Sequence, residues 1–330
     1  MADQAVHYLN NNVGMLLGKI YVADAFDENM RETLQGIIKN IVDSYRIAIN
    51  ESPRMTSATK SKAIEKLDKM KFRIGYPDKW QDYSSLEPVP GTLVENHMRI
   101  QRYENKRNID KLSKPVDKDE WEMPPQTVNA YYVPTKNIFV LLAGILHEPF
   151  FSTNGTDAEH YGGIGFVIGH EIGHGFDDKG SRFDGDGNLV NWWSKEDTEA
   201  YNKIKNALIA QADNYEILPG KYLNGELEIG EIMGDASGAE ISLRAFQNII
   251  KSKHLDPDQG YRDFFIQLAK TWRDKLRPDF QLLILDKDPH PPSEFRANGI
   301  VKNFDEFHTV FITKPGDAMY MAADERVHIW

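Results

Sequence analysis

The chain has 330 residues, with 39 Lys and Arg against 50 Asp and Glu, which gives a formal net charge of −11. Hydrophobic residues make up 41% of the chain, a composition typical of a globular protein rather than a disordered one. The acidic balance argues against nucleic acid as a partner, because phosphate backbones are bound by clustered Lys and Arg. The absence of cysteine excludes disulfides, thiolate metal ligands and cysteine nucleophiles.

The sequence shows no membrane or export signal. The longest apolar run covers residues 138–146, far short of the roughly 20 residues that span a bilayer. The first basic side chain is Lys19, behind Asp3 and three consecutive asparagines, which is not the basic-then-apolar order of a signal peptide. We therefore expect a cytoplasmic protein without membrane contact, and secretion after processing remains an alternative.

The N-terminal third has the pattern of helices. Over residues 27–50, apolar side chains recur at spacings of three and four, which predicts one buried helical face. A second helix is predicted over residues 57–71, where apolar side chains face inward and Lys and Glu face outward, and a Gly-Tyr-Pro sequence at residues 75–77 stops it. Residues 78–125 carry many prolines and charges, and we expect a connecting region with short helices there.

The pattern changes near residue 128. Two β-prone segments, residues 128–133 and 138–142, flank a turn and predict a hairpin. The small residues at 160–165 either let the backbone pass close to another segment or turn the chain. Helical patterns return over residues 166–174, residues 196–211 with Ser194 as N-cap, and residues 231–250, and the remainder mixes helices with a loop at residues 286–292.

Residues 170–174 read His-Glu-Ile-Gly-His and carry the chemistry. Residues four apart share a helix face, so His170 and His174 can bind one Zn²⁺. Glu171 points elsewhere on the helix, but it can reach a water at the metal and act as general base. The alternative is a pair of surface histidines, against which the apolar residues 166–168 argue.

A catalytic zinc usually has three protein ligands and one open position. Because the chain lacks cysteine, the third ligand must be His, Asp or Glu, and Glu231 is the best candidate. If its segment is helical, Glu231 and Asp235 share a face, so Asp235 could accept a hydrogen bond from a ligand imidazole. A solvated acidic helix face is the alternative, and the apolar neighbours of Glu231 argue against it.

The sequence resembles the neprilysin and endothelin-converting-enzyme family of zinc metallopeptidases, most closely its bacterial oligopeptidase O branch. Six segments carry the resemblance: residues 73–78, 128–132, 143–146, 161–178, 230–235 and 295–299. The resemblance implies a mainly α fold with a small β-sheet (α+β), of the thermolysin-like zinc peptidase type. In it, residues 1–78 correspond to the family's interdomain or lid-side helices and residues 79–330 to the catalytic domain.

The resemblance also implies roles at the metal. It makes His170, His174 and Glu231 the ligands of one Zn²⁺ per chain, with Glu171 as general base. It also implies that Asp235 is the hydrogen-bond partner of a ligand imidazole, with His170 as the expected one. Ile232 departs from the family, which usually has Asn there.

Further roles concern the peptide substrate. His290 matches the family's hydrogen-bond donor to the oxyanion, and Arg296 matches an arginine that binds a substrate carbonyl or terminal carboxylate. Asn129 and Ala130 correspond to an edge strand that binds the peptide backbone. The apolar pocket for the residue after the cut is formed in the family at the positions of Ile145, Phe150, Val167 and Trp272.

Members of the family are much longer, and the part without a counterpart here supplies an N-terminal helical lid. We therefore expect an exposed apolar face, covered by a second protein chain in a heterodimer or by a second copy. The predicted function is a zinc-dependent endopeptidase that cuts short peptides before large apolar residues, as the catalytic part of a two-part enzyme. The alternatives are a non-catalytic, zinc-containing peptide-binding or scaffold subunit, and a zinc hydrolase of non-peptide amides.

Overall fold

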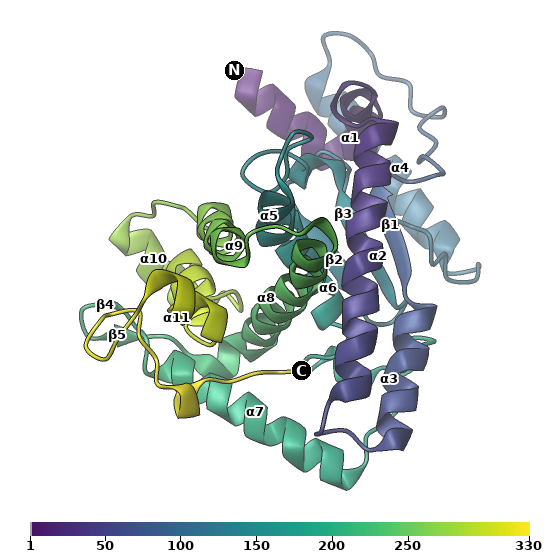
Figure 1. Ribbon diagram of the computed structural model, residues 1–330. Coiled ribbons are helices and arrows are strands. Elements are labelled where there is room, and N and C mark those ends of the chain that lie inside the picture. Colours follow the sequence, from purple (N-terminus) through teal and green to yellow (C-terminus); the bar gives the residue numbers. More distant parts are fainter. Residues whose placement is uncertain (1) are drawn as a thin grey trace. The chain divides into compact units, whose positions relative to one another are not determined.

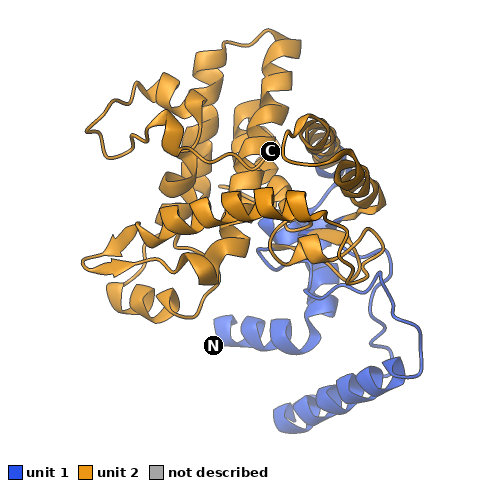
Figure 2. Ribbon diagram, turned by 90° about the horizontal axis from the view of Figure 1, so that it is seen from below, with its two compact units in different colours: residues 1–32, 73–129, 141–145 blue, residues 33–72, 130–140, 146–330 orange. Residues whose placement is uncertain are grey.

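The computed structural model describes residues 2–330, which form two compact units (Figure 2). Unit 1 contains the chain up to Glu32, together with Arg73–Asn129 and Leu141–Ile145. Unit 2 is Thr33–Phe72, Ala130–Val140 and Leu146–Trp330. The boundary predicted after residue 78 comes from the family resemblance and not from the packing of the chain, so these two units do not test it, and it stays a prediction. Within residues 2–330, no helix is both long and apolar enough to cross a membrane.

The described residues are mainly helical, with two small sheets (Figure 1), as predicted. The helices are α1 Ala2–Ala25, α2 Glu28–Glu51, α3 Ser57–Lys69, α4 Leu93–Lys111, α5 Asp157–His160, α6 Phe166–Gly173, α7 Lys195–Asp213, α8 Gly225–Lys253, α9 Pro257–Thr271, α10 Pro278–Leu285 and α11 Asp305–Phe311. The strands are β1 Lys71–Gly75, β2 Ala130–Val133, β3 Ile138–Leu142, β4 Glu216–Leu218 and β5 Lys221–Tyr222, in sheets of order β1-β3-β2 and β4-β5.

Several predicted elements are confirmed. The helices expected over residues 27–50 and 57–71 are α2 and α3. Helix α7 begins after Ser194, whose hydroxyl accepts the Asp197 N–H at 3.0 Å, as a capping residue should. The β2–β3 hairpin is also present, and its turn places Asn137 in the left-handed region at φ 52°, a conformation that Asn tolerates better than most residues.

Residues 78–125 differ from expectation. Instead of short helices, they contain α4, a helix of 19 residues in which only Ile100 is buried. Charged pairs one turn apart support it: Lys106 lies 2.7 Å from Asp110, and Arg107 lies 2.9 Å from Glu104. Such pairs stabilise a helix locally without a buried face, and the prolines and charges around the segment favoured a connecting region instead.

Helix α6 lies in the core of unit 2, and each of its residues is buried. It packs against α8 (Figure 1) at a glycine crossing, because a Cβ on Gly238 would lie 2.7 Å from the Phe166 carbonyl oxygen. On another side, the Tyr45 hydroxyl of α2 donates a hydrogen bond to the Gly169 carbonyl at 2.6 Å. Residues 170–174 therefore lie in and directly after a rigid, closely packed helix.

The small-residue segment before α6 passes close to two neighbours. It forms one π-helical turn, Tyr161–Gly165. A Cβ on Gly162 would lie 2.4 Å from the Phe264 carbonyl oxygen, and one on Gly163 would lie 2.4 Å from that of Phe150. The glycines are therefore needed for close backbone approach, which was one of the two expectations for this segment.

Candidate metal centre

The structure brings the three predicted metal ligands together. His170 lies on α6 and His174 is the C-cap residue one turn later, with their ring centroids 4.5 Å apart. Glu231 of α8 places Oε2 at 3.3 Å from His170 Nε2 and Oε1 at 3.7 Å from His174 Nε2. One ligand atom from each residue lies within 4.8 Å of the others, so all three can contact one ion.

The chemistry of this cluster fits a metal ion. Glu231 Oε2 is buried, and no hydrogen bond from the described residues reaches it, a situation that native proteins avoid unless water or an ion is bound. Burial opposes ionisation of Glu231, but its contacts with His170 and then His174 outweigh burial and lower its pKa. Two imidazole nitrogens and one anionic oxygen form a donor set suited to a divalent ion with one open position.

A buried carboxylate orients the first histidine. His170 Nδ1 donates to Asp235 Oδ1 at 2.8 Å, and Arg296 Nε donates to Asp235 Oδ2, also at 2.8 Å. Burial lowers the pKa of His170, but its hydrogen bond to Asp235 and the adjacent Glu231 carboxylate outweigh burial and raise that pKa to about 10. With its Nδ1 proton held by Asp235, the ring presents Nε2 to the metal position.

A second carboxylate, Asp177, was missed in the sequence. Asp177 Oδ2 lies 2.7 Å from His174 Nδ1, while its Oδ1 accepts the Lys179 and Gly180 N–H groups at 2.8 and 2.6 Å. Each imidazole therefore has a carboxylate on the nitrogen that faces away from the cluster. The only signal was an aspartate three residues after His174, which periodicity alone cannot distinguish from a turn residue.

Glu171, the predicted base, is buried on α6 with 7% of its surface exposed. Burial raises the pKa of its carboxyl group, and the nearby His174 and His170 act in the opposite direction. A carboxyl group tuned upward by burial is suited to accept a proton and return it. Its catalytic role stays a prediction.

The predicted oxyanion donor and the predicted substrate-binding arginine both lie beside the cluster. His290 Nε2 is 3.5 Å from Glu231 Oε2, and the Asp288 carboxylate holds its Nδ1 at 2.8 Å. Arg296 is buried, with its guanidinium 3.8 Å from the centre of the Trp272 ring and bonded to Asp235. Arg296 thus lies behind His170, and its contact with substrate stays a prediction.

The remaining predicted residues fall into both units. Val167 is buried on α6, Phe150 is half-buried, and Trp272 meets the Phe166 ring edge-on at 5.8 Å, all in unit 2. Ala130 also belongs to unit 2 and begins β2, which is an edge strand of its sheet. Asn129 and Ile145 belong to unit 1. Their substrate roles stay predictions.

A hollow of 210 Å³ adjoins the cluster. Its walls come from the β2–β3 hairpin, the segment after α6, α8 and the loop before His290: Tyr132, Pro134, His174, Asp177, Lys179, Gly180, Leu227, Gly230, Glu231 and Pro289. Because two of the three cluster residues line it, this hollow is the candidate binding site.

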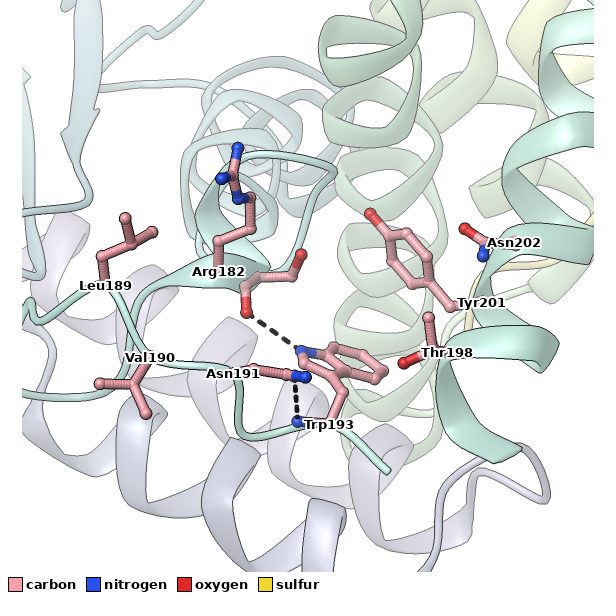
Figure 3. A pocket seen from close by; sticks show the side chains of 9 residues that line it. Arg182, Leu189, Val190, Asn191, Trp193, Thr198, Tyr201 and Asn202 are labelled. Carbon is pink, nitrogen blue, oxygen red and sulfur yellow. Dashed lines mark hydrogen bonds between the residues drawn. The ribbon is translucent and has the colours of Figure 1, made fainter. Parts of the chain in front are cut away.

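A larger hollow of 340 Å³ lies elsewhere in unit 2, between the segment around Arg182 and helix α7 (Figure 3). Its wall includes Trp193, which donates to the Ser181 carbonyl at 3.0 Å, and Tyr201. None of the described residues that line it is a histidine or carries an acidic side chain. It therefore lacks the groups that hydrolysis needs.

Comparison with known proteins gives the same family throughout. The family model "Peptidase family M13" matches residues 129–327, and its N-terminal counterpart matches residues 2–77. A neutral endopeptidase of Lactococcus lactis is 36% identical over 329 residues, which cover 99% of this chain and 51% of that protein. Endothelin-converting enzyme 1 of Homo sapiens is 35% identical over 322 residues, or 94% of this chain and 42% of that protein.

Solved structures agree with this. The zinc metalloprotease Zmp1 of Mycobacterium tuberculosis, in complex with an inhibitor, superposes with a TM-score of 0.92 at 40% identity, over 99% of this chain and 51% of that one. PepO of Lactobacillus rhamnosis superposes with a TM-score of 0.90 at 32% identity, over 97% of this chain and 50% of that one. The chain spans about half the length of the curated relatives it matches. By the family models and by its relatives alike, it belongs to peptidase family M13.

Proposed function

We propose that the protein is a zinc-dependent endopeptidase. The observation that supports this best is the convergence of His170, His174 and Glu231 within 4.8 Å, with Glu171 buried on the same helix in a chain of peptidase family M13. Bound Zn²⁺ would supply Lewis acidity and an open coordination position. A cytoplasmic location is a separate prediction from the sequence.

In the proposed reaction, water adds to the scissile carbonyl carbon and the C–N bond then breaks. Glu171 takes a proton from the attacking water and delivers it to the leaving amine, so protons balance over the cycle. His290, held at Nδ1 by Asp288, donates a hydrogen bond to the developing oxyanion. Asp235 and Asp177 keep both histidines in one tautomer throughout.

We propose short peptides as substrates, with a large apolar residue just after the cut. The position of β2 at a sheet edge supports binding of an extended backbone. Val167 and the Trp272 ring offer apolar surface near α6.

Two substitutions test this proposal. Glu171→Gln should retain zinc and lose peptide cleavage, because an amide accepts no proton from water. Glu231→Val should lose zinc, because two imidazoles then remain as ligands. Metal content by atomic absorption and cleavage of a quenched fluorescent peptide, with and without chelator, separate these outcomes. Full activity in either variant contradicts the assignment, and zinc without any cleavage by the wild type favours the non-catalytic subunit.

We also propose that a second protein chain completes the enzyme. Unit 1 supports this, because helix α4 exposes large apolar side chains along one face: Val94 (68% exposed), Met98 (48%) and Ile109 (65%), followed by Leu112 (87%). Their separations of four, eleven and three residues keep them on one side of the helix. An exposed apolar helix face is a typical docking surface for another helix.

Light scattering after size-exclusion chromatography tests the partner proposal. The expected result is self-association of the chain alone, relieved by the double variant Val94→Glu and Ile109→Glu. Arg102→Glu, which changes an exposed charge on the same helix, is the matched control. A wild-type chain that is monomeric, stable and fully active by itself overturns the proposal.

A further inference from the structure

The hollow beside the metal cluster has one charged side chain in its wall, Lys179, to which no role has been given so far. Lys179 lines this 210 Å³ space together with His174 and Glu231. Lys179 is exposed, and among the described residues no hydrogen bond or ion pair involves its ammonium group, although its charge acts on the adjacent Asp178 carboxyl group. Among the described residues in the wall of the hollow, it is the only cationic side chain other than histidine.

The other polar groups of the hollow are already engaged. Asp177 holds His174 and two backbone amides. The Tyr132 hydroxyl donates to Asn137 Oδ1 at 2.8 Å. Glu231 belongs to the cluster. The unused hydrogen-bonding capacity of the hollow is therefore that of a charged donor, and the complementary ligand group is a carboxylate.

The backbone that carries Lys179 is fixed on both sides. Its own N–H donates to Asp177 Oδ1 at 2.8 Å. The next carbonyl, of Gly180, accepts Lys66 Nζ at 2.7 Å, and a Cβ on Gly180 would lie 1.7 Å from the His174 carbonyl oxygen. The backbone of Lys179 is thus fixed, while its side chain is exposed and can extend toward a ligand in the hollow.

We propose that Lys179 forms a subsite for a carboxylate on the substrate, so that the enzyme prefers peptides with an acidic side chain near the cut. This rests on the proposed peptidase function. The hollow shares no residue with the predicted apolar pocket of Phe150, Val167 and Trp272. The acidic residue therefore occupies a position other than the one directly after the cut, and we place it before the cut.

Binding measurements on the zinc-loaded Glu171→Gln variant test the subsite without turnover. The probes are blocked hexapeptides with one Phe after the intended cut and Glu, Gln or Lys at each of the two preceding positions. A Gln peptide with a free C-terminus tests whether a terminal carboxylate is recognised instead. The same affinities are measured after adding Lys179→Gln, Lys179→Glu or the control Lys203→Gln, which removes an exposed charge from α7.

A glutamate peptide should bind roughly two- to fivefold more tightly than its Gln counterpart, the effect of one partly screened ion pair. Lys179→Gln should abolish this ratio, Lys179→Glu should reverse it in favour of the Lys peptide, and Lys203→Gln should leave it unchanged. Equal affinities for all blocked peptides, or a ratio that survives Lys179→Gln, overturn the subsite. Preference only for the free C-terminus overturns the side-chain assignment. Failure of the wild type to cleave any peptide instead overturns the proposed function.

Discussion

Glu228 is expected to destabilise the folded protein at alkaline pH. It lies on α8, one turn before Glu231, with 1% of its surface exposed. Neither of its carboxylate oxygens receives a hydrogen bond from the described residues. Burial, and then the negative charges of Asp288 and Asp213, raise the pKa of Glu228 from 4.5 to about 8. Such a group is stable in the fold only while it carries its proton.

The sign and size of the effect follow from linkage. Because the folded-state pKa is raised, folding favours the protonated form. The contribution of Glu228 to stability is therefore fully present below pH 4.5 and is lost as the pH rises to about 8. One pKa unit is worth about 1.4 kcal/mol, so ionising Glu228 in the fold costs at most about 5 kcal/mol. Glu228→Gln has nearly the same shape and removes this cost, although its amide is also unsatisfied, at about 1–3 kcal/mol.

We therefore expect Glu228→Gln to raise the free energy of unfolding by about 2 kcal/mol at pH 8.5 and to change it little or unfavourably at pH 5. Urea denaturation followed by tryptophan fluorescence at both pH values measures this. Glu199→Gln, at an exposed site on α7, is the control and should show no comparable pH dependence. A Glu228→Gln protein that is less stable than wild type at pH 8.5, or equally shifted at both pH values, refutes the reasoning.

Three other substitutions probe the groups behind the cluster. Asp235→Ala should cost about 3–5 kcal/mol in urea denaturation, because Arg296 is left as an unpaired buried charge. Lys66→Met should cost about 1–3 kcal/mol, because two backbone carbonyls lose their buried donor, whereas Lys62→Met on the exposed face of the same helix should cost under about 0.5 kcal/mol. Asp177→Asn should weaken zinc binding about tenfold in chelator competition, and an unchanged affinity would contradict its orienting role.

The local part of the site was predictable from the sequence. Spacing alone put His170 and His174 on one helix face, since the helix repeat is independent of tertiary context. Apolar neighbours correctly indicated that this helix is buried. Spacing alone did not predict Glu231 as a ligand, because no pattern in residues 175–230 indicates how the chain returns to the two histidines. Its acidic neighbour Asp235 and the family resemblance supplied that link.

The rest depends on contacts between distant segments. Lys66 looks like an ordinary charge of an amphipathic helix, yet it is 1% exposed and bonded to the carbonyls of Gly180 and Phe183. Glu228 looks like a solvated acid in a first helical turn. Arg296 gave no sign that Asp235 would hold its guanidinium. In each case the burial of a charged side chain is decided by tertiary packing, which periodicity does not encode.

Helices α6 and α8 cross at glycines and pack so closely that no additional side-chain atom fits between them. A Cβ at position 234 would lie 2.8 Å from His170 Cε1, and one at position 238 would lie 2.8 Å from the His170 backbone nitrogen. A larger side chain at either position would force the two helices apart and move Glu231 away from His170 and His174. A library randomised at these two positions and selected for metal retention should return glycine, so attempts to re-engineer the ion preference should start from the hairpin and loop walls instead.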